Sequence, residues 1–228
     1  MSYTVYDPLR LFPVAGVLFD MDGLVLDTEK LYSRFWQEAC ISLGYPMTRD
    51  QALTMRALNS QAGEANLRKF FGPQVDYQQV RSQRIQLMDA YIEENGVEPK
   101  KGTRELLDYL EEEKIPVALA SSSPRDRIRA YLQPLGLFER FPLICSGYEV
   151  AHGKPEPDIF LFAAQKLGLS PKFCMVLEDS PAGILAASRA GCMPVMIPDL
   201  DGPDLETEAL LAAKADSLLD VIPLISHI

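Results

Sequence analysis

Two aspartates stand directly after an apolar segment near the start of the chain. Residues 14–19 read VAGVLF, and Asp20 and Asp22 follow, with Gly23 next to them. A short apolar run of this kind is typical of a strand that is buried on both faces of a sheet. An isolated carboxylate is costly to bury, so two of them at the end of one strand indicate a bound cation or a catalytic task. One could attack an electrophile while the other transfers protons, and Mg²⁺ could be held there beside phosphate oxygens.

A run of serines follows the next predicted strand of the sheet. Residues 116–120 predict that strand, and Ser121, Ser122 and Ser123 come after it, with Pro124 at the start of a predicted helix. Hydroxyls and free N–H groups at a helix start can bind an anion. Ser121, at the strand tip, is the candidate for this role, whereas Ser123 is predicted to be the N-cap of the helix.

A lysine and two adjacent acids complete the set of polar loops. Lys154 lies between a glycine and two prolines in HGKPEPD, and Glu178 and Asp179 directly follow a strand predicted over residues 173–177. A lone lysine is usually solvated, and one acid before Pro181 could cap a helix, but a cap explains two adjacent acids poorly. Because the carboxyl ends of parallel strands meet at one edge of a sheet, we expect these groups to lie near Asp20.

In chain order, the segments DMDGLVLDT, ASSS, GKPEPD and EDSPAGILAASRAG resemble the four motifs of the haloacid dehalogenase-like superfamily, in its phosphatase and phosphomutase branch. DMDG alone could be a polar turn, but four motifs in order are specific. The resemblance implies an Mg²⁺-dependent phosphatase that hydrolyses a small phosphate monoester through an aspartyl-phosphate intermediate. It implies that Asp20 is the nucleophile and that Asp22 protonates the leaving oxygen and then activates water. Ser121 and Lys154 would bind the transferring phosphoryl group, Ser122 would help to bind substrate, and Asp20, the backbone carbonyl of Asp22, Glu178 and Asp179 would hold the metal.

The order of predicted elements indicates an α/β fold with an inserted helical domain. Helices are predicted over residues 28–43, 49–55, 61–71 and 77–95 without an intervening strand. From residue 103 onward, helices and strands alternate, which is typical of a doubly wound parallel sheet. We therefore expect a core domain of residues 1–29 and 99–228 and an all-helical cap domain of residues 30–98. Residues 1–13 are expected to be a tail without a function of its own.

Composition restricts the possible partners. The formal net charge is -10, from 22 basic and 32 acidic residues, which argues against binding to nucleic acid or to an anionic membrane. No apolar run approaches the ~18 residues that span a bilayer. The four cysteines show no metal-ligand spacing. We expect a cytoplasmic protein with reduced thiols, a monomer or weak homo-oligomer, whose partner is a small phosphorylated metabolite.

Within the superfamily, the pattern resembles the beta-phosphoglucomutase-like subgroup, which contains mutases and phosphatases with a small helical cap. Tyr32 stands where the mutases have histidine, Pro124 where they have lysine, and Arg56 where their cap loop has glycine, and these departures favour hydrolysis. DTEKLYS and HGKPEPDIF are similar to stretches of pseudouridine-5'-phosphatase and related sugar phosphatases. In the loop TMRALNSQ, Arg56 and Asn59 are candidates for contacting the leaving group of the substrate. A solvated helix end is the alternative for each.

Other activities stay open at this stage. A mutase of the beta-phosphoglucomutase type shares every core motif and is the first alternative. A phosphoryl-accepting receiver module uses a similar set of residues, but it would lack the helical insertion and would not need Asp22. A dehalogenase would lack Asp22, Glu178 and Asp179, which makes these three residues the discriminating ones.

Overall fold

The computed structural model describes residues 3–55, 58, 60–199 and 202–226 of the chain. It divides into two compact units, the core unit (Met1–Asp27 with Glu98–Ile228) and the helical unit (Thr28–Val97). Each unit is described by itself. The domain boundaries predicted from the sequence, between residues 29 and 30 and between residues 98 and 99, stay a prediction.

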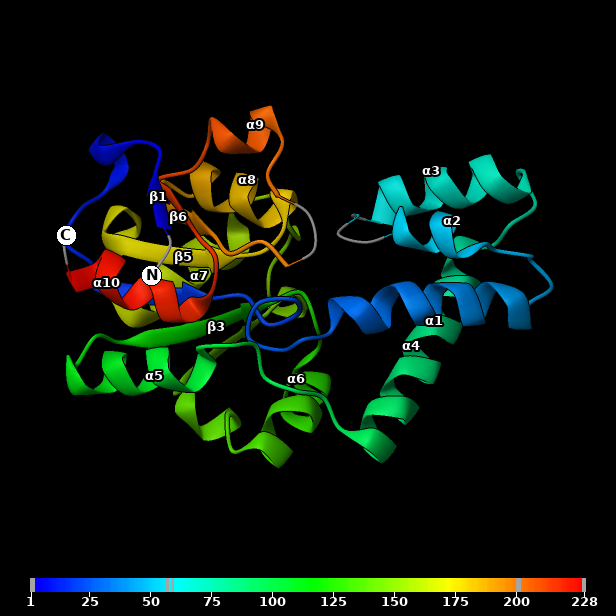
Figure 1. Ribbon diagram of the computed structural model, residues 1–228, viewed down its shortest axis with the longest axis horizontal. Helices are drawn as coiled ribbons and strands as arrows, with labels where there is room; N and C mark the ends of the chain where they lie inside the picture. Colours follow the sequence, from blue (N-terminus) through cyan, green and yellow to red (C-terminus); the bar gives the residue numbers. More distant parts are fainter. Residues whose placement is uncertain (1–2, 56–57, 59, 200–201, 227–228) are drawn as a thin grey trace. The chain divides into compact units, whose positions relative to one another are not determined.

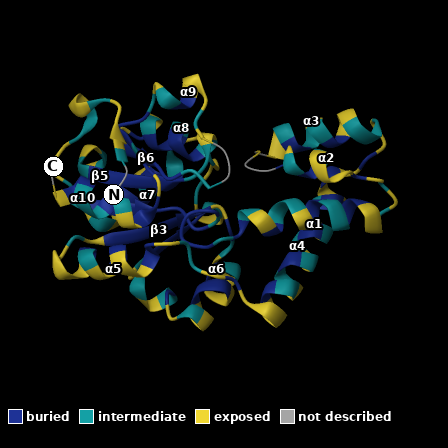
Figure 2. Cartoon of the chain, in the orientation of Figure 1, coloured by how far each residue is buried: buried dark blue, intermediate teal, exposed yellow. Residues whose placement is uncertain are grey.

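The core unit contains a seven-stranded sheet in the order β1-β7-β6-β5-β2-β3-β4. Figure 1 labels β1, β6, β5 and β3 of this sheet. β2 (Gly16–Phe19) lies between β3 (Val117–Ser121) and β5 (Cys174–Glu178) and pairs with both in parallel. The remaining strands are β1 (Tyr3–Val5), β4 (Leu143–Ser146), β6 (Met193–Met196) and β7 (Ala213–Ala215). All residues of β2, β3, β5 and β6 are buried, which fits the apolar runs in the sequence. Figure 2 shows β3, β5 and β6 in dark blue.

Helices cover the sheet. They are α5 (Thr103–Glu112), α6 (Arg125–Leu132), α7 (Asp158–Leu167), α8 (Pro181–Arg189), α9 (Leu205–Glu208) and α10 (Val221–Ser226). One face of the sheet, which includes Leu18, Ala118 and Val176, packs against Phe160 of α7 and Ala186 of α8. Alternate strand residues face the other way, where the ring of Phe19 contacts that of Phe141 at 5.5 Å between centroids.

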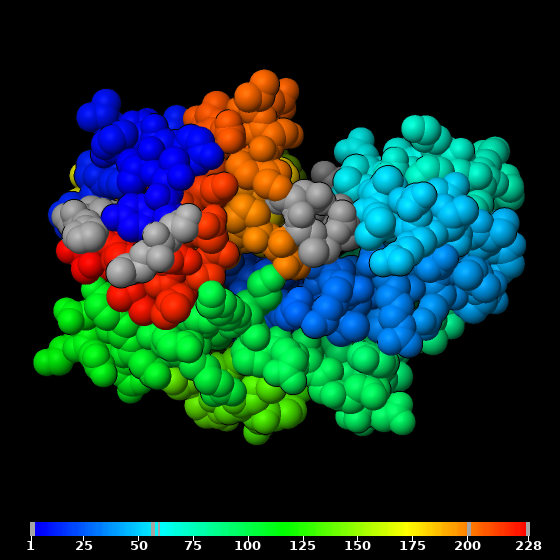
Figure 3. All heavy atoms as spheres, in the orientation of Figure 1, coloured from blue at the N-terminus to red at the C-terminus, as the bar shows by residue number. Residues whose placement is uncertain are grey.

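The edge of the sheet differs from the prediction. Residues 3–5 were expected in a tail but form β1, which pairs antiparallel with β7, so the sheet is mostly rather than wholly parallel. Both strands have three residues, too few for a period of two to be visible in a sequence. Tyr6, which directly follows β1, helps to hold this edge in place, because its hydroxyl donates to Glu208 Oε1 at 3.1 Å. Figure 3 shows these N-terminal atoms in blue beside the orange atoms around α9.

Short 3₁₀ helices complete the core unit: η1 (Pro8–Arg10), η2 (Gln133–Leu135), η3 (Phe138–Arg140), η4 (Gly147–Glu149), η5 (Pro171–Phe173) and η6 (Leu218–Asp220). Gly102 is the N-cap of α5 and has φ 89°, and a Cβ on it would lie 2.2 Å from the backbone nitrogen of Leu219. Only glycine allows this close approach of the two segments.

The helical unit consists of α1 (Glu29–Ser42), α2 (Arg49–Leu53), α3 (Ser60–Phe71) and α4 (Tyr77–Asn95). α2 begins with a capping box in which Thr48 and Gln51 exchange hydrogen bonds. The unit has its own core, which includes Trp36, Met55, Leu67 and Val80. All four helices lie close to the ranges that the sequence pattern predicts.

Arg84 interrupts the apolar stripe of α4. It is 6% exposed, and its guanidinium lies over the rings of Tyr32 at 4.5 Å and Trp36 at 5.2 Å. Nη1 contacts Met88 Sδ at 4.0 Å, and Nε has no hydrogen-bond partner among the described residues. Cation–π contacts therefore take the place of a carboxylate partner for this buried charge.

All four cysteines are buried as free thiols. Cys40 lies in α1 of the helical unit, and Cys145, Cys174 and Cys192 lie in the core unit.

Candidate active site

The carboxyl ends of β2, β3 and β5 bring three polar side chains to one edge of the sheet. Asp20 follows β2, and Ser121 and Glu178 are the last residues of β3 and β5. The backbone N–H of Asp20 donates to the carbonyl of Leu177 at 3.1 Å, which extends the ladder one residue beyond the strand. All three side chains are buried, with Glu178 1% exposed and Asp20 8%. The parallel register thus places the three groups together.

Lys154 connects the strand ends. Its Nζ donates to Asp20 Oδ1, to Glu178 Oε1 at 2.7 Å and to the carbonyl of Ala120 at 3.0 Å. The side chain is 8% exposed, so the two ion pairs are screened little by solvent. The loop before it is held by Asp158, whose Oδ1 accepts from the backbone N–H of His152 at 3.2 Å.

Glu178 is held from two sides. Its Oε1 accepts from Lys154, and its Oε2 accepts from the N–H of Asp179 at 3.2 Å, the N–H of Ser180 at 3.1 Å and the hydroxyl of Ser180 at 2.9 Å. The carboxylate lies against Gly183 in the first turn of α8, where a Cβ would stand 1.9 Å from Glu178 Cδ. Gly183 therefore makes the space in which this carboxylate sits.

Burial and neighbouring charges shift the pKa values of Asp20 and Lys154. Burial raises the pKa of Asp20 to about 7, with Lys154 acting in the opposite direction and Glu178 and Asp22 adding repulsion. Burial alone would lower the pKa of Lys154, but Asp20 and Glu178 outweigh burial and raise it above its usual value. Lys154 is thus a permanent cation at the site, while the acids together hold more negative charge than it can balance.

The acids form a group that could hold a metal ion. Asp20, Glu178 and Asp179 each offer a carboxylate oxygen, and these oxygens lie within 4.8 Å of one another. An all-oxygen set of this kind suits a hard divalent cation. Burial, with added repulsion from Glu178 and Asp22, raises the pKa of Asp20, and a bound cation would act in the opposite direction. The predicted role of the Asp22 backbone carbonyl stays a prediction.

The serine loop differs from the prediction in one respect. Helix α6 begins at Arg125, and its N-cap is Pro124, which makes no side-chain cap. Ser123 was expected to be this cap, but its hydroxyl lies 3.3 Å from Asp22 Oδ2. Ser121 is fully buried and its Oγ accepts from the N–H of Ser123 at 3.1 Å, whereas Ser122 is exposed.

Several residues that shape the site were not singled out from the sequence. Ser180 and Gly183 hold Glu178, and Ser146, at the end of β4, donates to the carbonyl of Ser123 at 2.7 Å. Gly183 could have been found from the sequence, because it is a glycine in the first turn of a segment, SPAGILAAS, that otherwise favours a helix. The candidate substrate contacts Arg56 and Asn59 lie outside the described residues.

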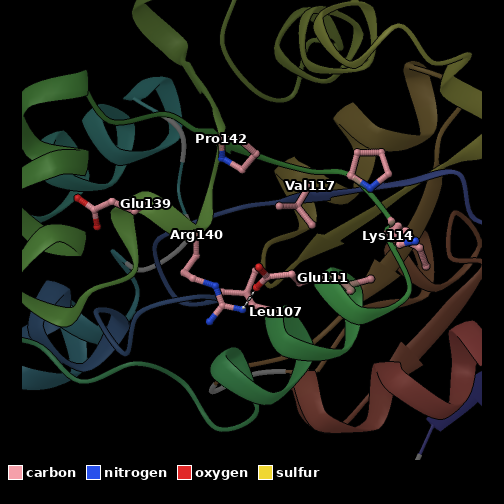
Figure 4. Close-up of a pocket in the computed structure, with 10 residues that line it drawn as sticks. Leu107, Glu111, Lys114, Val117, Glu139, Arg140 and Pro142 are labelled. Atoms are coloured by element: carbon pink, nitrogen blue, oxygen red, sulfur yellow. Dashed lines mark ion pairs between the residues drawn. The ribbon is translucent and has the colours of Figure 1, made fainter.

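A separate pocket of about 370 Å³ lies at the other end of the sheet. It includes Val117, the first residue of β3, and so opens at the amino end of the strand whose last residue is Ser121. In Figure 4, the side chain of Arg140 points toward Glu111, with which it pairs at 3.2 Å, and Glu139 points away. None of the candidate catalytic residues lines this pocket.

Within the described residues, none of the helices has both the length and the apolar character that crossing a bilayer requires.

Comparison with known proteins gives the family. Residues 14–191 match the haloacid dehalogenase-like hydrolase family. A phosphorylated carbohydrates phosphatase of Thermotoga maritima is 30% identical over 91% of this chain and 97% of its own length. A probable pseudouridine-5'-phosphatase of Drosophila melanogaster is 34% identical over 82% of each chain. Beta-phosphoglucomutase of Bacillus subtilis is 28% identical over 91% of this chain and 93% of its own.

A solved structure supports the fold. A hydrolase from Pseudomonas syringae has a TM-score of 0.79 and 23% identity, and the match covers 95% of this chain and 99% of that one. The mostly parallel sheet, the match across residues 14–191 and the named phosphatases among the relatives agree with the resemblance that the four motifs carry. The chain belongs to the haloacid dehalogenase-like hydrolase family, and within it to the phosphatases.

Proposed function

We propose that this phosphatase is Mg²⁺-dependent and hydrolyses a small phosphate monoester, a sugar phosphate or a nucleotide-like ester, through an aspartyl-phosphate on Asp20. The observation that carries the proposal is the contact of Lys154 with both Asp20 and Glu178, beside Asp179, at the carboxyl ends of β2 and β5. This arrangement joins a nucleophile, a fixed cation and a metal-binding group in one buried cluster. The names of two relatives, a phosphorylated carbohydrates phosphatase and a probable pseudouridine-5'-phosphatase, support the substrate class.

The reaction has two steps. In the first, a carboxylate oxygen of Asp20 attacks the phosphorus, the bond from phosphorus to the ester oxygen breaks, and Asp22 gives its proton to that oxygen, so the alcohol leaves neutral. In the second, Asp22 takes a proton from water as the water oxygen attacks the phosphorus. The carboxylate of Asp20 is released together with inorganic phosphate.

Fixed charges stabilise the phosphoryl oxygens during both steps. Lys154 is held in place by three acceptors, so it needs no reorganisation when charge builds up on phosphorus. Ser121 is assigned to binding the transferring group, and the exposed Ser122 to the substrate. Mg²⁺ held by Asp20, Glu178 and Asp179, with the Asp22 carbonyl, would supply further positive charge to the phosphoryl oxygens.

We assign the binding of the leaving group of the substrate to residues of the helical cap domain. Arg56 and Asn59 are the candidates for contacting the leaving group, because a guanidinium can hold hydroxyls or a second anion. The cap domain is assigned residues 30–98 and the core domain residues 1–29 and 99–228.

The test is phosphate release from sugar phosphates, nucleotides and pseudouridine monophosphate, with Mg²⁺ and with EDTA. We expect release that requires Mg²⁺, that is lost in Asp20→Asn and that persists in the control Asp126→Asn, an exposed aspartate of α6. Phosphate release by Asp20→Asn at the wild-type rate would refute the assignment of Asp20 as the nucleophile.

A mutase is the second candidate, favoured by the beta-phosphoglucomutase among the relatives. It predicts isomerisation of a hexose phosphate that is primed by the bisphosphate, with little phosphate release. The two activities are distinguished by following both products from one sample.

A further inference from the structure

Ser123 contacts the proton-transferring residue of the proposed mechanism. Its Oγ donates to Asp22 Oδ2 at 3.3 Å, and the serine is 6% exposed. The cap role expected of this hydroxyl is absent, because the N-cap of α6 is Pro124. The proposed mechanism gives Ser123 no task, so the contact calls for an explanation.

The backbone of Ser123 is fixed independently of Asp22. Its N–H donates to Ser121 Oγ at 3.1 Å, and its carbonyl accepts from Ser146 Oγ at 2.7 Å. Ser121 and Ser146 are register partners at the ends of the parallel strands β3 and β4. Two buried hydroxyls at the tips of neighbouring strands therefore set the position of this loop. Ser123 Oγ has the geometry of a preorganised donor.

The backbone of Asp22 is fixed as well. Gly23 turns the chain with φ 82°, and its N–H donates to the carbonyl of Leu26 at 2.9 Å. Asp22 and Leu26 form a parallel bridge, and Leu26 in turn bridges Pro99. Both partners of the Ser123–Asp22 contact thus stand on rigid backbone, so the hydrogen bond restricts the rotation of the carboxylate about its own bonds.

We infer that Ser123 is a positioning residue, whose hydroxyl orients the Asp22 carboxyl group so that this group, when protonated, can pass its proton to the leaving oxygen of an alkyl phosphate. This inference rests on the proposed function. Proton transfer needs the carboxylate within hydrogen-bond reach of the ester oxygen and in the right plane. The hydrogen bond from Ser123 to Asp22 Oδ2 restricts the orientations that the carboxyl group can take. Ser123 acts through Asp22 and binds no phosphoryl oxygen itself.

The dependence on the leaving group separates this role from others. An alkyl alcohol leaves as a strong base and needs the proton, whereas p-nitrophenolate leaves without one. kcat/KM reports the steps through formation of the phosphoenzyme, so it isolates leaving-group departure from the later attack of water. A residue that positions the acid should therefore affect kcat/KM for the alkyl ester much more than for the aryl ester.

The experiment compares wild type, Ser123→Ala and Asp22→Asn on a sugar phosphate and on p-nitrophenyl phosphate, with Mg²⁺. For Ser123→Ala we expect kcat/KM to fall about 10- to 100-fold on the sugar phosphate, the usual scale for loss of a supporting hydrogen bond, and to change little on the aryl ester. Because both substrates are measured on the same preparation, any loss of folded protein lowers both equally. Ser170→Ala, an exposed serine before β5, is the control.

A double variant completes the test. Because Ser123 acts only through Asp22, Asp22→Asn/Ser123→Ala should be no slower than Asp22→Asn alone. Equal losses on both esters, or a further loss in the double variant, would overturn the inference and assign Ser123 to phosphate binding or to the fold. Unchanged kinetics of Ser123→Ala would overturn it too. A wild type that hydrolyses neither ester would instead refute the proposed function.

Discussion

Gly183→Ala should destabilise the protein, although alanine is a better helix former than glycine. In an exposed helix this substitution stabilises by about 1 kcal/mol. Here the new Cβ would lie 1.9 Å from Glu178 Cδ and Oε1 and 2.3 Å from Oε2. The carboxylate cannot move away without losing partners, because Lys154 holds Oε1 and two N–H groups and a hydroxyl hold Oε2.

The expected magnitude follows from three contributions. Overpacking a well-packed site costs about 1 to 3 kcal/mol, and losing a hydrogen bond to a charged group costs about 1.5 to 3 kcal/mol. The helix gains about 1 kcal/mol from alanine. The free energy of unfolding should therefore fall by about 1.5 to 5 kcal/mol, which lowers Tm by about 3 to 20 °C for a chain of this size. Because Glu178 is a candidate metal ligand, Mg²⁺ affinity should fall as well.

The assay is thermal and urea unfolding of Gly183→Ala, with a double-mutant cycle as control. In a Glu178→Ala background the carboxylate is gone, so the same glycine substitution should stabilise by up to about 1 kcal/mol. The sign of the effect thus reverses between the two backgrounds. Gly183→Ala that raises Tm in the wild-type background would refute the reasoning, because the carboxylate would then have free space to move.

Four further predictions concern other parts of the molecule. Asp22→Asn should lower phosphate release by about 10²- to 10⁴-fold; a near-normal rate in a steady-state assay would reassign the proton transfer. Gly102→Ala should lower Tm far more than Gly136→Ala, since both have positive φ but only Gly102 faces a backbone atom, Leu219 N at 2.2 Å; equal losses would show that the segment relaxes. Arg84→Met should be tolerated better than Arg84→Lys in urea unfolding, because methionine has no charge to bury and lysine loses the planar stacking on Tyr32 and Trp36; the reverse order would contradict this. Asp204 is the N-cap of α9, and hydrogen bonds from Thr207 lower its pKa. The Tm difference between wild type and Asp204→Asn should therefore be present above about pH 4, the unfolded-state pKa of aspartate, and shrink as the pH falls through the lower folded-state pKa; a difference that grows in acid would exclude this role of the Asp204 carboxylate.

The gathering of the polar groups could be predicted because parallel strands deliver their ends to one edge. Asp20, Ser121 and Glu178 each follow an apolar run, and that pattern alone placed them side by side. The helical unit could be predicted for a similar reason, since long amphipathic segments carry a clear period.

What could not be predicted depends on contacts between distant segments. Ser123 has the sequence context of a helix cap, and only the position of Asp22, about a hundred residues earlier, shows the other use of its hydroxyl. β1 and β7 are too short to show a period. β1 is a strand through its pairing with β7, and β7 also pairs with β6 on its other side. Gly183 is required by a carboxylate five residues before it, through a turn whose shape the sequence does not reveal.

The buried cysteines offer a way to watch each unit open separately. Burial raises the pKa of Cys40 to about 12 and those of Cys145 and Cys174 to about 11, and the pKa of Cys192 is also raised. Since the thiolate is the reactive form, alkylating reagents should modify these residues only when a unit unfolds locally or globally. Cys40 reports on the helical unit and the other three report on the core unit. Peptide mapping after brief alkylation would therefore give the opening rate of each unit in the natural sequence, without an introduced probe.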